Sequence, residues 1–212
     1  MLNLITLVGS IALQGVLPPD SVLRLSLRVH LLRSPESPGL TTTLADSDVH
    51  TYLATANSIW QQAGIHWELE SVVREDAPNG ALFERLIAGK APGQLVSFVP
   101  RAHLLTSGWN VFLIQDFGRI GGGVFLPEIQ GVLLAQRGFG FELPPGGRGG
   151  ATLAHELGHS LGLKHEQCDA MRNIMANGCW DPSARSSLTP EQIALARKQA
   201  LAGRPTPTVP TP

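Results

Sequence analysis

Two histidines and a glutamate have a spacing that suits metal chemistry. His155 and His159 are four positions apart, and on a helix this spacing projects both imidazoles from one face, about 6 Å apart along the axis. Two nitrogen ligands held in this way form half of a tetrahedral zinc site. Glu156 stands beside the pair, where its carboxylate can hold a zinc-activated water without ligating the metal.

A third histidine completes the set only if the helix ends. His165 lies six residues after His159, and on a continuing helix this rotates it by about 240°, away from the pair. Gly162 stands between them, and a residue that tolerates positive φ allows the chain to turn back. The spacing predicts three zinc ligands with a fourth position open for water, which is typical of a catalytic site.

The alternative is a structural or lost metal site, or histidines that merely pack on a helix face. Glu156 argues against it, because a structural site has no use for a carboxylate at that position. We expect the other histidines to be surface or packed residues, namely His30, His50, His66 and His103. Three carboxylates could bind calcium or line a cleft, but calcium is not indicated and solvated loop positions are expected for Asp116, Glu128 and Asp169.

The composition of the whole chain limits what surrounds this motif. The chain has 212 residues, with 16 Lys and Arg against 17 Asp and Glu, so it lacks the basic charge of a nucleic-acid binder. The length suits one domain. The 23 Gly and 16 Pro favour many turns and long loops over a helical bundle.

Both ends of the chain differ from the middle. Residues 2–17 are mostly apolar, and we interpret residues 1–19 as a signal peptide, with Ser10 and Ala12 as a cleavage site. No Lys or Arg precedes the run, so a buried strand or a marginal anchor helix remain the alternatives. Residues 204–212 read RPTPTVPTP and predict an extended tail or linker.

The segment between the ends, residues 20–203, reads as one mixed α/β (α+β) domain. Asp46 is expected to cap a helix that stops at Gly64, and Thr189 with Gln192 forms a capping box for the last helix. Residues 76–107 look irregular, with a weak helix at 81–88. The expected strands are 23–31, 65–73, 110–115, 121–125 and 131–136, and the expected helices start at 46, 151 and 190.

The full pattern HExxHxxGxxH, followed by Met175, resembles the metzincin clan of zinc endopeptidases. The resemblance implies a twisted mixed sheet of about five strands with one antiparallel edge strand, a zinc helix and a C-terminal helix. It also implies a Met-turn at Met175 beneath the zinc, with Met171 as a weaker candidate. Glu166 and Gln167 resemble the astacin pattern, but the only tyrosine, Tyr52, precedes the motif, so no tyrosine ligand is expected.

The two cysteines, Cys168 and Cys179, flank Met175 and resemble pappalysin-like or other secreted members more loosely. We assign only the clan. A bridge between them would close a loop of about 12 residues and contribute about 2–3 kcal/mol, and a secreted chain favours a bridge over two free thiols. The alternative role for Cys168 is that of an inhibitory zinc ligand.

The function expected from these features is a secreted, monomeric zinc endopeptidase with one Zn²⁺ and a peptide or protein substrate. Glu156 is the expected general base and acid. The clan resemblance implies that Trp180 walls the pocket for the side chain after the cut. The substrate would lie extended along an edge strand that contains Gly122, Gly123, Val124 and Phe125.

Three other functions remain open. One is a zinc-stabilised module that binds peptides or surfaces without cutting them, and the intact Glu156 disfavours it. Another is a toxin or effector with one narrow proteolytic target. The third is a cytoplasmic or membrane-anchored protease, which follows if residues 1–17 are not a cleaved signal. We expect no nucleic-acid partner and, for the mature chain after signal cleavage, no stable membrane insertion.

Overall fold

A computed structural model describes residues 21–89, 94–138, 140–167, 172–176 and 186–203. The expectations for the N-terminal apolar run, the Thr/Pro tail and five single residues lie outside these ranges. Those five are Cys168, Asp169, Met171, Cys179 and Trp180.

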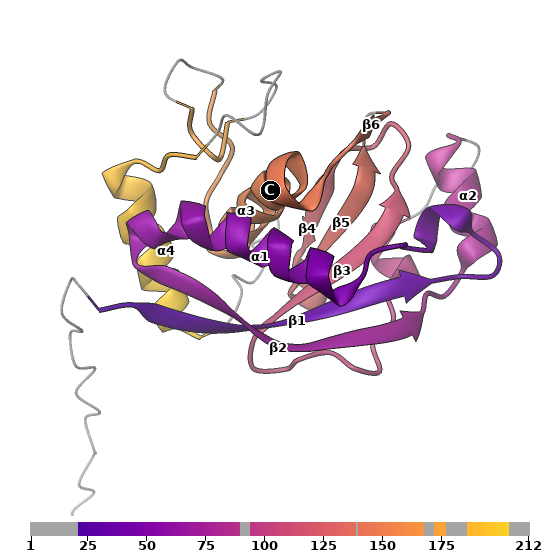
Figure 1. Cartoon of the computed structure of the whole chain (residues 1–212), viewed down its shortest axis with the longest axis horizontal. Helices are drawn as coiled ribbons and strands as arrows, with labels where there is room; N and C mark the ends of the chain where they lie inside the picture. The colour runs from indigo at the N-terminus through magenta and orange to yellow at the C-terminus, as the bar shows by residue number, and fades with distance from the viewer. Residues whose placement is uncertain (1–20, 90–93, 139, 168–171, 177–185, 204–212) are drawn as a thin grey trace, which may run out of the picture.

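The central element is a mixed sheet whose strands follow the order β2-β1-β3-β5-β4 (Figure 1). Neighbouring strands along this path are parallel except for β4, which pairs antiparallel with β5 at one edge. A short strand, β6, also pairs with β5. The strands are β1 (Leu23–Arg33), β2 (Ile65–Asp76), β3 (Trp109–Asp116), β4 (Gly123–Leu126), β5 (Gly131–Gly138) and β6 (Phe141–Glu142). This topology confirms the expected fold class.

One face of the sheet is covered by the long helices α1 (Asp46–Trp60) and α3 (Gly150–Ser160), which lie in front of it in Figure 1. The alternate leucines of β1, from Leu23 to Leu31, point into the apolar cluster beneath them. The helix α4 (Pro190–Leu201) packs beside this layer and contributes Ala196 and Ala200 to the same cluster. The period-two pattern of β1 was therefore a correct guide to its buried face.

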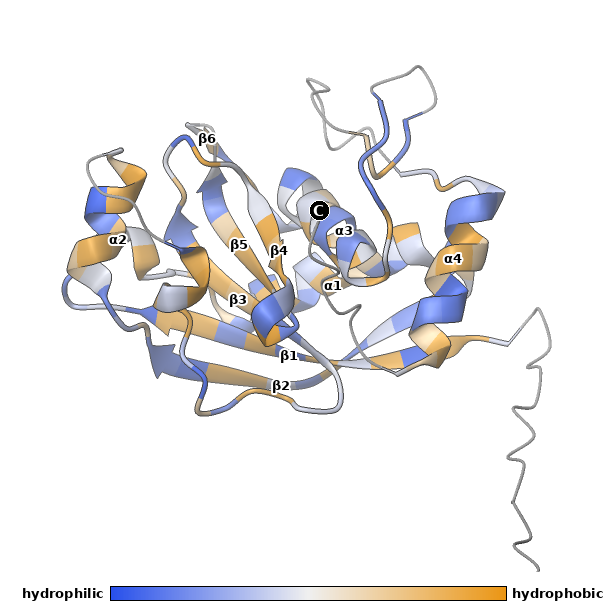
Figure 2. Cartoon of the chain, turned by 180° about the vertical axis from the view of Figure 1, so that it is seen from behind, coloured by the Kyte–Doolittle hydropathy of each residue, from blue (hydrophilic) through white to orange (hydrophobic). Residues whose placement is uncertain are grey.

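A second, thinner layer covers the opposite face, as seen from behind in Figure 2. It is built from α2 (Gly80–Ile87) and the short turns η1 (Pro38–Leu40) and η3 (Leu95–Phe98). Its cluster contains Phe83, Phe98 and Phe112. Since β3 contributes to both clusters, it is buried on both faces, as its continuous apolar run indicated.

The element boundaries differ from the sequence expectations at three places. Asp46 does not cap α1: the N-cap is Ala45, and Asp48 accepts its backbone N–H at 2.8 Å. A carboxylate at the third helical position reaches back to the cap better than one at the first. The glycine-rich edge strand begins at Gly123 rather than at residue 121. The sequence from 139 to 150 is rich in glycine and proline and predicts a long loop. Its described residues, 140–150, include β6 and the helical turn η5 (Pro145–Gly149).

The end of α1 and the start of α4 follow the expected local chemistry. Gly64 has φ 60° after the turn η2 (Gln61–Ala63), a conformation that glycine adopts without strain. Gln192 donates its backbone N–H to Thr189 Oγ1 at 3.2 Å, and its side chain accepts the Thr189 N–H at 2.9 Å. No helix among the described residues is both long and apolar enough to cross a membrane.

Candidate metal centre

The three histidines of the motif meet at one point beside α3. The Nε2 atom of His159 lies 3.2 Å from that of His155 and 3.0 Å from that of His165, and the latter two Nε2 atoms are 3.2 Å apart. Four-coordinate zinc with Zn–N bonds of 2.0–2.1 Å places its nitrogen ligands about 3.3 Å from one another. The spacing of the three nitrogens therefore fits a single tetrahedral zinc ion.

Backbone carbonyls fix which ring nitrogen of two histidines faces the centre. His155 Nδ1 lies 2.7 Å from the carbonyl oxygen of Ile174, and His159 Nδ1 lies 2.9 Å from that of Leu163. A carbonyl accepts only, so each Nδ1 carries the proton and each Nε2 presents a lone pair. Burial lowers the pKa of His159, which favours the neutral ring that a metal requires. Converging lone pairs repel one another unless a cation lies between them.

The chain turns back after α3 through a left-handed residue. Gly162 has φ 81°, and its N–H donates to the His159 carbonyl at 2.9 Å. The N–H of Leu163 donates to the Gly158 carbonyl at 3.0 Å. This pair of bonds is a Schellman motif. It brings His165 back to the helix face and directs the Leu163 carbonyl at His159.

Glu156 is enclosed between α3 and the edge strand β4. Only 6% of the residue is exposed, and its carboxylate accepts a hydrogen bond from the backbone of Phe125. Burial raises the pKa of Glu156 to about 8, and the Phe125 contact opposes this rise. Gly123 makes the enclosure possible, because a Cβ there would lie 2.8 Å from Glu156 Cγ.

Met175 lies beneath the metal-site helix. It is fully buried, and a Cβ on Gly158 of α3 would overlap its sulfur atom. Its carbonyl accepts the N–H of Glu166, the neighbour of the third histidine, at 2.9 Å. The segment that carries Met175 therefore touches both the helix and the third-ligand turn. The weaker candidate, Met171, lies outside the described residues.

The expected cleft residues line the β4 edge in part. Among the described residues β4 pairs only with β5, so its other edge has no strand partner. Val124 and Phe125 are half-buried and pack against opposite clusters, and Gly122 is buried near Leu143 and Thr152. Tyr52 is in the core, and its hydroxyl donates to the Leu143 carbonyl at 3.1 Å.

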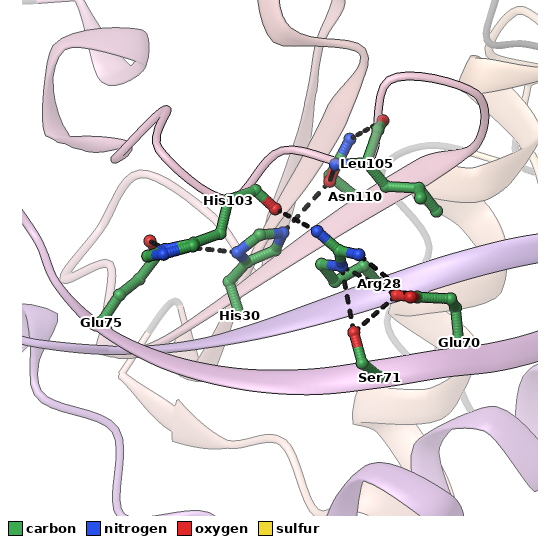
Figure 3. Close-up of polar contacts among 8 residues, drawn as sticks. All are labelled: Arg28, His30, Glu70, Ser71, Glu75, His103, Leu105 and Asn110. Atoms are coloured by element: carbon green, nitrogen blue, oxygen red, sulfur yellow. Dashed lines mark hydrogen bonds and ion pairs between the residues drawn. The ribbon is translucent and has the colours of Figure 1, made fainter.

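The histidines outside the motif separate into two kinds. His50 and His66 are exposed, as expected. His30 and His103 belong to a polar cluster on the other side of the sheet, which the sequence analysis did not anticipate (Figure 3). Glu75 joins them, with its carboxylate oxygens 2.5 Å from His30 Nδ1 and 2.8 Å from His103 Nδ1.

This cluster ties the loop before β3 to the sheet. Asn110 is 3.1 Å from His30 Nε2, and its side chain bonds both backbone groups of Leu105. Arg28 donates to the His103 carbonyl at 2.7 Å. The side-chain partners of His30 and His103 lie 28 to 80 residues from them in the chain, so no local spacing could have revealed these contacts. Their dense backbone anchoring indicates a structural role.

Two of the carboxylates considered for calcium, Asp116 and Glu128, are among the described residues and lie in different elements. Asp116 accepts the Gly118 N–H at 2.6 Å and forms an ion pair with Arg137 at 3.5 Å. Glu128 is an exposed residue of η4 (Pro127–Ile129). Among the described residues, the three motif histidines form the one group with metal-ligand geometry.

The fold is similar to solved protein structures, although no protein-family model and no curated protein matches the sequence. Mirolysin, solved in complex with compound 9, superposes with a TM-score of 0.57 at 14% identity, over 84% of this chain and 91% of that chain. Metalloproteinase-II from Bacteroides fragilis gives a TM-score of 0.44 at 12% identity, over 86% of this chain and 55% of the other. The mirolysin superposition shows that this chain has a metallopeptidase-like fold.

Proposed function

We propose that this chain is a zinc-dependent endopeptidase of the metzincin type. The observation that carries the proposal is the convergence of three imidazole Nε2 atoms within 3.2 Å of one another, next to the buried carboxyl of Glu156. Two of the rings are oriented by backbone carbonyls, as is usual for histidines that ligate zinc. The metallopeptidase-like fold supports the same conclusion.

Glu156 acts as the proton carrier in this proposal. Zinc bound by the three histidines supplies a water of lowered pKa and a Lewis acid that polarises the scissile carbonyl. The Glu156 carboxylate takes up a proton and later delivers it to the leaving amine. Its enclosed position suits this role, because burial disfavours the charged carboxylate and therefore favours the uptake of a proton.

The substrate, a peptide or protein, lies extended along the unpaired edge of β4 and adds a strand through backbone hydrogen bonds. The backbone of Phe125 contacts Glu156, so a substrate strand paired with β4 would lie close to the proposed base. Trp180 walls the pocket for the residue after the cut and makes it partly apolar. A Trp180→Ala variant should therefore change the cleavage-site profile of the enzyme, and an unchanged profile would refute this assignment.

Further parts of the proposal concern the cellular setting and the framework of the site. The apolar residues 2–17 direct secretion of a monomeric enzyme, and a Cys168–Cys179 bridge encloses the segment of Met175. Met175 serves as the Met-turn residue, which its burial against Gly158 supports. Secretion assays and disulfide mapping by mass spectrometry test these points independently of catalysis.

The central test is cleavage of an unbiased peptide mixture, with products identified by mass spectrometry and zinc content measured in parallel. The wild type should cut, Glu156→Ala should bind zinc and not cut, and Glu128→Ala, which alters an exposed carboxylate, should cut normally. Equal cutting by the wild type and Glu156→Ala would contradict the proposed role of Glu156. Zinc in all three proteins with no cutting would favour the binding module or a protease with one narrow target.

A further inference from the structure

Two buried amide side chains link the last helix to the metal centre. Asn173 and Gln192 are 4% and 7% exposed. Asn173 Nδ2 donates to Gln192 Oε1 at 2.8 Å, and Gln192 Nε2 donates in return to Asn173 Oδ1 at 3.3 Å. A reciprocal pair of this kind fixes the orientation of both amides and leaves no buried polar atom unsatisfied between them.

The Asn173 end of the pair reaches the first histidine. Asn173 Oδ1 also accepts the N–H of Met175 at 2.8 Å, and this bond closes a tight turn around Ile174. The carbonyl of Ile174 accepts the Nδ1 proton of His155 at 2.7 Å. The amide of Asn173 therefore fixes the direction of a carbonyl that orients a metal ligand, and such outer contacts affect metal affinity.

The Gln192 end reaches the third histidine. Gln192 Nε2 is 3.5 Å from Glu166 Oε1, and Glu166 directly follows His165 in the chain. Among the described residues a groove of about 540 Å³ lies between the turn after α3 and the start of α4, with both Glu166 and Gln192 in its lining. The contact between Gln192 and Glu166 therefore connects the two segments that border this groove.

We propose that Gln192 is a positioning residue of the metal centre and that α4 thereby contributes to zinc affinity. The inference rests on the proposed zinc site and extends it to the C-terminal helix. A capping box requires only the Oε1 atom of Gln192, which accepts the Thr189 N–H. The two donations from Nε2, to Asn173 and towards Glu166, have no part in the cap and serve the metal centre instead.

The substitution Gln192→Glu separates the two roles. Glutamate keeps an acceptor for Asn173 Nδ2 and for the cap of α4, and a negative charge is favourable at a helix N-terminus. It loses the Nε2 donor and places carboxylate oxygens opposite Asn173 Oδ1 and Glu166 Oε1. The matched control is Thr189→Ala, which weakens the cap and leaves the Gln192 side chain unchanged.

Zinc affinity is measured by competition with a chelator, and the visible spectrum of the Co²⁺-substituted protein reports ligand geometry. We expect Gln192→Glu to weaken zinc binding about tenfold or more and to shift the cobalt spectrum. Thr189→Ala should lower the Tm by a few degrees and change zinc affinity by less than twofold. In a double-mutant cycle, Gln192→Leu combined with Asn173→Leu should cost less affinity than the sum of the two single changes, because both remove the Asn173–Gln192 contact.

Wild-type affinity and an unchanged cobalt spectrum in both Gln192 variants would overturn the inference and leave the proposed function intact. A wild type that binds no zinc would overturn both. A wild type that binds zinc and cuts no peptide would contradict only the proposed catalysis, because none of these measurements depends on turnover.

Discussion

At the scale of single residues, the geometry of the site depends on what each functional side chain touches. The motif assigned candidate roles to His155 and Glu156 and predicted the turn at Gly162, which has φ 81°, because spacing on a helix and tolerance of positive φ are local properties. It could not predict that the carbonyls of Ile174 and Leu163 would orient two of the rings. Every residue has a backbone carbonyl, so only the folded structure determines which carbonyls accept hydrogen bonds from the histidine rings.

The buried carboxyl of Glu156 makes the stability of the metal-free protein depend on pH. Its pKa rises from 4.5 to about 8 in the folded state, so the fold favours the protonated form. The contribution of Glu156 to the free energy of unfolding is fully present below pH 4.5 and is lost as the pH rises towards 8. Glu156→Gln, which stays neutral, should match the wild-type Tm near pH 4.5 and exceed it by about 5 °C or more at pH 8.

Thermal unfolding in the presence of a chelator, measured between pH 4.5 and 8.5, tests this expectation. Glu128→Gln serves as the control, because that carboxylate is exposed and should give the same pH profile as the wild type. A constant Tm difference between Glu156→Gln and the wild type across this range would contradict the conclusion that burial raises the pKa of Glu156.

Gly123 is the residue of β4 that leaves room for Glu156, the proposed general base. An alanine Cβ would lie 2.8 Å from Glu156 Cγ and 3.2 Å from its Oε1, so the carboxyl must move. We expect Gly123→Ala to lower kcat/KM tenfold or more, since small displacements of a catalytic group are costly, and to leave zinc content unchanged. Gly146→Ala is the matched control, because its Cβ meets only Thr51 Cγ2 at 3.4 Å. Wild-type kcat/KM in Gly123→Ala would contradict this role.

At the scale of elements, the sequence predicted the strands and helices that have strong periodicity. It was less accurate where turns determine the boundaries of an element. The capping box placed the start of α4 correctly, because Thr189, Pro190 and Gln192 carry that signal locally. It did not reveal that the same Gln192 contacts Asn173, since that contact depends on tertiary packing. The strand β6 was missed because two residues are too few to show a period.

The polar cluster around Glu75 gives a prediction for the loop that precedes β3. Glu75→Ala leaves His30 Nδ1 buried without an acceptor and releases His103, so we expect a loss of about 2–4 kcal/mol in the free energy of unfolding. His103→Ala should cost less than about 1 kcal/mol, because that side chain is 57% exposed. Urea denaturation measures both values, and equal losses in the two variants would contradict the central role of Glu75.

At the scale of the whole molecule, the sheet separates two layers with different tasks. The thinner layer covers the face opposite α1 and α3 (Figures 1 and 2). The candidate metal centre lies on the side of α3, and the Glu75 cluster lies on the other side of the sheet. The first layer could be predicted because its helices are long and amphipathic. Of the second layer only α2 was predicted, as the weak helix at 81–88. The turns η1 and η3 were not, since they are short and their apolar residues meet only in the folded chain.

The most direct test of the account is X-ray absorption spectroscopy at the zinc edge on the full chain loaded with one equivalent of Zn²⁺. Three histidines with an open fourth position predict a first shell of about three nitrogens and one oxygen at about 2.0–2.1 Å, with outer scattering from three imidazoles. The same shell should persist in Glu156→Ala, because Glu156 is not a ligand. A sulfur neighbour at about 2.3 Å, or a shell without three imidazoles, would contradict an open three-histidine site.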